Sequence, residues 1–91
     1  MTVTVRVPTQ LRTLTGGAGE LTVPGTTVGE VLKGLDAAHP GIAERLFDGS
    51  GALRRFVNVF VEEEDVRFLE GLDTPVADGQ TVSIVPAVAG G

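Results

Sequence analysis

The sequence predicts one domain of the α+β class, in which a mixed sheet packs on one main helix. Stretches in which apolar and polar residues alternate stand before and after a single stretch with helical apolar spacing, so strands precede and follow one helix. The 91 residues are enough for one compact domain and too few for two. Because a helix connects the two groups of strands, we expect the first and last strands to be parallel neighbours in the centre of the sheet.

The first two predicted strands form a hairpin with a long loop. Residues 2–7 alternate, with Val3, Val5 and Val7 on one face, and Pro8 ends the strand. A glycine-rich stretch at 15–19 favours a turn, after which residues 20–23 return as an antiparallel partner. We expect Leu11 and Leu14, inside the loop, to stay on the core.

The main helix is predicted to begin at Thr27. Thr27 and Glu30 match a capping box, in which each side chain bonds a free backbone amide at the start of the helix. Pro40-Gly41 ends the helix. Between these points, four apolar residues recur at helical spacing: Val28, Val31, Leu32 and Leu35. A short helical turn at 42–47 and a loop at 48–51 are expected next.

The stretch 56–61 alternates again and raises a question about its two faces. The valines at 57, 59 and 61 are predicted to face the core, which leaves Phe56, Asn58 and Phe60 on the other side. Phenylalanines exposed on a sheet indicate a contact surface. The alternative is that a loop covers them.

The last third is predicted to contain an acidic turn at 62–65, a short edge strand at 66–69 and a final strand at 81–85. Asp78-Gly79 favours a turn before that final strand, and Pro86 ends it. We therefore expect a domain of residues 1–86, followed by a flexible tail of residues 87–91.

Composition excludes most other kinds of function. The chain has no cysteine, so disulfides and thiolate chemistry are excluded, and it has no apolar run long enough to cross a membrane. Its net charge is −5 with scattered basic residues, which argues against nucleic acid as a partner. His39 is the only histidine, and neither it nor the serines belong to a catalytic or metal-binding motif. We expect a cytoplasmic protein that binds no metal and is not itself an enzyme.

The C-terminus is the one remaining chemical feature. After Pro86 the chain ends in small uncharged residues: Ala87, Val88, Ala89, Gly90 and Gly91. A carboxylate is a poor electrophile until its oxygen becomes a good leaving group, as in an acyl adenylate. Glycine has no Cβ and lets a narrow channel close around the chain, so the tail suits entry into another enzyme. The alternative is an ordinary frayed terminus.

The segment from Asp78 to Gly91 resembles the end of the ubiquitin-like sulfur carriers of the ThiS/MoaD type, which have the β-grasp fold. Further matches favour the CysO type, the branch that serves thiocarboxylate-dependent cysteine biosynthesis in actinobacteria. These matches are at residues 3–5, 8–9, 15–17, 41–42, 44–46, 55–58 and 64–68. This resemblance implies a β-grasp roll for the fold and a sulfur carrier for the function.

The resemblance also implies the chemistry and the partners. An adenylating enzyme of the ubiquitin-activating type would use ATP to convert the Gly91 carboxylate to an acyl adenylate. Sulfur from a rhodanese-like or cysteine-desulfurase route would then give a thiocarboxylate. In the family, a cysteine synthase with pyridoxal phosphate uses this sulfur, and a metallopeptidase later frees the cysteine. The carrier itself would bind neither cofactor, and its docking face would include Phe56, Phe60 and Phe68 beside tail residues 87–90.

Three alternatives remain at this point. The sulfur acceptor could be molybdopterin or a secondary metabolite, because the acceptor chemistry belongs to the partner enzyme. The chain could instead be a ubiquitin-like modifier that is joined to lysines through Gly91, although Lys33 is its only lysine and extensive chain-building is disfavoured. The third alternative is a plain interaction domain with a fortuitous tail.

Overall fold

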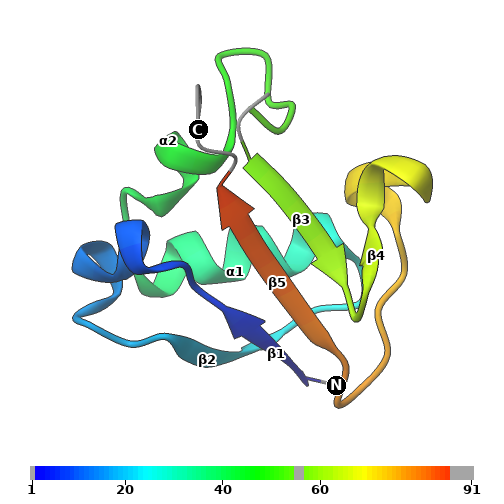
Figure 1. Cartoon of the computed structure of the whole chain (residues 1–91), viewed down its shortest axis with the longest axis horizontal. Coiled ribbons are helices and arrows are strands. Elements are labelled where there is room, and N and C mark those ends of the chain that lie inside the picture. Colours follow the sequence, from blue (N-terminus) through cyan, green and yellow to red (C-terminus); the bar gives the residue numbers. More distant parts are fainter. Residues whose placement is uncertain (1, 55–56, 87–91) are drawn as a thin grey trace.

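The computed structural model describes residues 2–54 and 57–86, which form a mixed sheet with helix α1 across one face (Figure 1). The strands are β1 (Thr2–Arg6), β2 (Glu20–Pro24), β3 (Val57–Val61), β4 (Glu64–Asp65) and β5 (Thr81–Pro86). The α helices are α1 (Val28–Ala38) and α2 (Ile42–Leu46), and the 3₁₀ helices are η1 (Thr9–Thr15), η2 (Val66–Phe68) and η3 (Gly71–Asp73).

The strand order confirms the predicted parallel centre of the sheet. The five strands are arranged β2-β1-β5-β3-β4. Strands β1 and β5 are parallel, with Thr4 opposite Thr81 and Arg6 opposite Ser83. The other neighbours are antiparallel. The connection through α1 explains this arrangement, because a crossover returns the chain to the sheet in the same direction.

The core lies between the sheet and α1, and the alternating valines supply most of it. Val57, Val59 and Val61 are buried, which confirms the predicted inner face of β3. The stripe on α1 is also buried, again as predicted: Val28, Val31, Leu32 and Leu35. Burial of this apolar surface is the main favourable contribution to folding.

The N-terminal hairpin is confirmed, with small differences in its bounds. Strand β1 ends at Arg6, one residue before the predicted end, although the Val7 amide still donates to the Gly19 carbonyl at 2.8 Å. The loop contains η1, and Leu11 and Leu14 pack partly on the core, as expected. Gly16 ends η1 with a φ of 68°, a left-handed conformation that favours glycine.

The start of α1 differs in one bond from the predicted capping box. Thr27 Oγ1 accepts a hydrogen bond from the Glu30 amide at 3.2 Å, as expected. The Glu30 carboxylate does not reach back to Thr27; it accepts from the backbone amide of Thr26 at 2.9 Å and from the Thr26 hydroxyl at 2.8 Å. These bonds, the backbone one first, lower the pKa of Glu30 because they favour its charged form. Thr27 lies opposite Pro75 in an isolated β-bridge, in which the Val28 amide donates to the Thr74 carbonyl and the Val76 amide donates to the Thr26 carbonyl, both at 3.0 Å.

Replacing Thr27 with alanine is expected to lower the free energy of unfolding by about 1 kcal/mol, because it removes the acceptor for the Glu30 amide. Chemical denaturation measures this change. Thr13→Ala, at an exposed position in η1, is the matched control and should stay within about 0.5 kcal/mol of the parent. Equal losses in both variants would show that the Thr27 bond contributes nothing.

The segment after β3 corrects two predictions. The edge strand is Glu64–Asp65, in the stretch predicted to be wholly a turn, and residues 66–68 form the 3₁₀ helix η2 in place of a strand. Val66 is buried whereas Phe68 is exposed. In a strand these two residues would share one face, whereas the three-residue turn of a 3₁₀ helix separates them.

Candidate functional site

The candidate site begins where the central strand ends. At the end of β5, Val85 pairs with Asn58 and Pro86 with Val57. The predicted reactive group at Gly91 lies outside the described residues. The same holds for the four tail residues before it, which are Ala87, Val88, Ala89 and Gly90. The structure therefore describes the base from which the tail starts and the surfaces around it.

One face of the sheet is left uncovered by the part of the chain that the structure describes, because α1 packs on the other face (Figure 1). The register brings one row of side chains together on this open face: Arg6, Ser83, Phe60 and Asp65. Phe60 is half-buried, and Val85, nearer the end of β5, is 43% exposed. The outward placement predicted for Phe60 is confirmed, and Phe56 lies outside the described residues.

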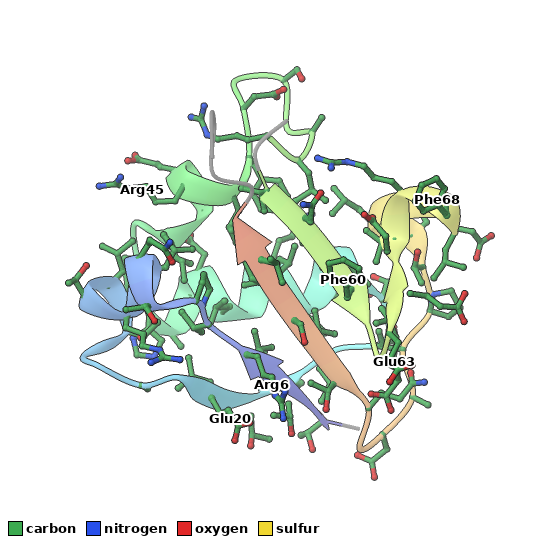
Figure 2. All side chains as sticks on the ribbon, viewed as in Figure 1. Arg6, Glu20, Arg45, Phe60, Glu63 and Phe68 are labelled. Carbon is green, nitrogen blue, oxygen red and sulfur yellow. The ribbon has the colours of Figure 1, made fainter. Side chains whose placement is uncertain are left out.

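Phe68 lies on a different surface from Phe60. Figure 2 shows Phe60 over the sheet on β3 and Phe68 on η2 at the edge of the molecule. The Phe68 side chain is 87% exposed, and the neighbouring Leu69 is 41% exposed. The structure thus places Phe60 and Phe68, the two predicted aromatic residues that it describes, on different surfaces. Sequence reasoning missed Leu69 because, in the predicted strand at 66–69, Leu69 and Phe68 would point to opposite faces of that strand.

Arg67 is a second residue that sequence reasoning missed. Its Nη1 donates to Asn58 Oδ1 at 2.7 Å, and its Nη2 donates to the carbonyl oxygens of Val57 at 2.8 Å and Arg54 at 2.9 Å. A planar guanidinium with five donors suits such a set of acceptors. Arg67 therefore ties η2 to the start of β3, which pairs with the end of β5.

The charges near the open face are mainly acidic. Glu62 and Glu63, in the turn between β3 and β4, and Glu64, the first residue of β4, are exposed. With Arg6 and Ser83 they line a shallow hollow over the sheet. Arg6 forms an ion pair with Glu20 at 3.2 Å, and both side chains are more than half exposed. Such a pair contributes little to stability, since water screens it.

The other polar candidates have local structural roles. His39 is the C-terminal cap of α1, where its amide donates to the Leu35 carbonyl. Ser50 donates its hydroxyl to Asp48 Oδ1 at 2.6 Å, and this bond is the main cause of the lowered pKa of Asp48. Within residues 2–54 and 57–86, no group of three or more His, Asp or Glu side chains is arranged to hold a metal ion. None of the described helices is long and apolar enough to cross a membrane.

Comparison with known proteins identifies the family and the fold of this chain. The model of the ThiS family matches residues 5–91. The sulfur carrier protein CysO of Mycobacterium tuberculosis is 54% identical over an alignment of 93 positions that covers both chains completely. The small archaeal modifier protein 3 of Haloferax volcanii is 43% identical over 65 positions, which cover 71% of this chain and 70% of that protein.

A solved structure shares the whole fold. The crystal structure of the Amycolatopsis orientalis BexX/CysO complex contains a chain that is 49% identical and superimposes with a TM-score of 0.92, over 98% of this chain and 99% of that one. The predicted β-grasp fold is thereby confirmed, as is the predicted resemblance. The chain belongs to the ThiS family, and its full-length likeness is to sulfur carrier proteins of the CysO type.

Proposed function

We propose that this chain carries sulfur as a thiocarboxylate on Gly91, formed by a partner enzyme of the ubiquitin-activating type. The observation that carries the proposal is the position of β5. This strand is the central one of the sheet and leads the chain out at Pro86 into a five-residue tail that ends in Gly90-Gly91. The match to the family model, which extends to residue 91, supports the same assignment.

The proposed chemistry has two steps, and both take place in the partner. A carboxylate oxygen of Gly91 attacks the α-phosphorus of ATP, and pyrophosphate leaves, which gives an acyl adenylate. A sulfide equivalent then attacks the acyl carbon, the bond to the AMP oxygen breaks, and a thiocarboxylate forms. The chain supplies the reacting carboxylate and holds no ATP itself, so it acts as a carrier and not as a catalyst.

The open face is the proposed docking surface for partners whose active site receives the tail. Val85 lies beside the start of the tail, opposite Asn58, and Phe60 lies two residues further along β3, opposite Ser83. A partner that receives residues 87–91 and extends over the open face would cover both side chains. Phe56 belongs to the same proposed surface. Partly exposed apolar side chains of this kind favour protein contacts.

The proposed acceptor is an enzyme of cysteine biosynthesis, a cysteine synthase that uses pyridoxal phosphate, with a metallopeptidase that releases the product. The full-length likeness to CysO supports this choice over molybdopterin or a secondary metabolite. The proposed location of the carrier is the cytoplasm.

A second candidate function is that of a protein modifier. The likeness to a small archaeal modifier protein favours it. A modifier needs the same Gly-Gly end and the same adenylation, after which a lysine amine, in place of sulfide, attacks the acyl group. Lys33, the only lysine of the chain, is exposed on α1 and could accept at most one further copy.

Intact mass spectrometry separates these functions. The protein is produced together with the activating enzyme of its own host and a sulfide source. A gain equal to the replacement of one oxygen by sulfur, located on Gly91, supports sulfur carriage. An unmodified carrier, together with tail peptides joined to lysines of other proteins, would assign the chain to the modifiers.

A further inference from the structure

After the edge strand β4, η2 and the residue that follows it present two neighbouring apolar side chains to solvent. Phe68, at the end of η2, is 87% exposed, and Leu69 is 41% exposed. We call these two residues the edge patch. Burying an aromatic ring stabilises a fold, so a large ring left outside the core indicates a surface used for contact.

The backbone beneath the edge patch is held in place on several sides. Val66 is completely buried, and the Asp65 carboxylate accepts from the Arg67 amide at 2.9 Å. The Leu69 amide donates to the Val66 carbonyl at 3.0 Å. A well-bonded turn with a buried anchor therefore holds the edge patch outward, so its exposure is part of the fold.

Arg67 links the edge patch to the point where the tail begins. The residue lies between Val66 and Phe68, and its guanidinium bonds to the Val57 carbonyl and the Asn58 side chain. Val57 and Asn58 pair with Pro86 and Val85, the last residues of β5. Hydrogen bonds thus join η2, the start of β3 and the end of β5 into one unit. A partner that binds Phe68 therefore meets the start of the tail at a fixed distance from Phe68.

The charges around the edge patch define the chemistry of its partner. Glu62, Glu63, Glu64 and Glu70 are exposed in the neighbouring segments. A hollow beside Leu69 is lined by three of these carboxylates together with Val61 and Pro75. Among residues 62–70, Arg67 is the one basic residue, and its guanidinium is bonded to β3. The complementary surface is an apolar pocket with Lys or Arg side chains at its rim.

We propose that the edge patch is a second docking point, separate from the open face. It binds an apolar pocket of the activating enzyme, with Lys or Arg side chains at the rim of that pocket, while the tail enters the active site of the enzyme. This inference rests on the proposed function. The activating enzyme is the partner chosen because every version of that function needs it: sulfur carriage to any acceptor, and protein modification, both begin with adenylation of Gly91.

The first test is Phe68→Ala in the full-length protein, with pyrophosphate release by the host's activating enzyme as the readout. The KM for the carrier is expected to rise about tenfold or more, as is typical for loss of a central aromatic contact, with kcat changed far less. The melting temperature should stay at the parent value because Phe68 is almost fully exposed. An unchanged KM would overturn the proposal.

A matched pair of charge variants tests the basic rim. Glu70→Gln removes a carboxylate beside the edge patch, whereas Glu44→Gln removes an exposed carboxylate on α2. Glu70→Gln is expected to raise the KM severalfold and to weaken its dependence on salt, and Glu44→Gln should do neither. Equal effects of both variants would contradict a local contact with a basic rim.

Two other outcomes are distinguishable. If the parent protein gives neither adenylate nor thiocarboxylate, the proposed function fails, whatever the edge patch does. If Phe68→Ala is activated normally but binds a sulfur-accepting enzyme less tightly, the edge patch belongs to that enzyme, and the present assignment to the activating enzyme is wrong.

Discussion

A chain that ends at Gly90 is expected to form no thiocarboxylate and to release no pyrophosphate with the activating enzyme. Loss of one residue draws the terminal carboxylate back by about 3.5 Å. Because a displacement of about 1 Å at a reacting centre can cost a factor of about a hundred in rate, this retreat is expected to abolish adenylation. Intact mass and pyrophosphate release measure the result.

The truncated chain is expected to unfold at the same temperature as the parent, since terminal residues generally bury little surface and the buried core of the described residues runs from Val3 to Ile84. Normal activation of a folded chain without Gly91 would contradict the whole carrier mechanism. Deleting Ala87 instead shortens the tail equally but keeps the Gly-Gly end. Comparison of the two deletions therefore separates the reach of the tail from the identity of its last residue.

Gly90→Val is the companion variant for the shape of the channel. A β-branched side chain adds bulk where a tight channel accepts only glycine and restricts the backbone as well. We expect slower activation at an unchanged melting temperature. An unchanged activation rate would show that the channel is wide at this position.

Leu32→Ala is expected to lower the free energy of unfolding by about 2–5 kcal/mol, the largest loss of stability that we predict. Leu32 is completely buried on α1 against the sheet, so the change leaves a cavity as well as removing apolar contacts. Alanine has the highest helix propensity, so α1 itself is not weakened and the loss measures packing alone. Urea denaturation with an unchanged m-value is the measurement.

The matched control for this variant is Leu69→Ala, the same substitution at a side chain that is 41% exposed. Its loss should stay below about 1 kcal/mol, as for surface changes in general. In a domain of this size, which buries a modest share of its surface, the Leu32 variant is expected to lose much of its total stability. Similar losses for both variants would show that the core does not depend on α1 packing.

Local sequence patterns predicted the elements that carry long, regular periods. The alternation in β1 and β3 identified their buried valines correctly, and the stripe on α1 identified its packed face. These patterns work because each side chain's face follows from the repeat of its own element. The parallel pairing of β1 with β5 was also predicted, because the crossover helix leaves few topologies.

The segment 62–69 shows where such patterns stop working. Its acidic residues and short apolar run carried too few repeats to distinguish a strand from a 3₁₀ helix. Asp65 decides the outcome locally: its carboxylate accepts from the Arg67 amide and starts η2 at Val66. Phe68 then points to solvent, and the acidic stretch contributes a short strand paired with the end of β3.

By itself, the sequence determined the fold class, the buried faces, the family and the Gly90-Gly91 end, because each of these is written in local periodicity or in a contiguous motif. Only the tertiary structure decided that Phe60 and Phe68 lie on separate surfaces and that Arg67 ties η2 to the base of the tail. The acceptors of the Arg67 guanidinium lie 9 to 13 positions away along the chain. Contacts over such separations form only when the sheet brings the strands together, and no local pattern records them.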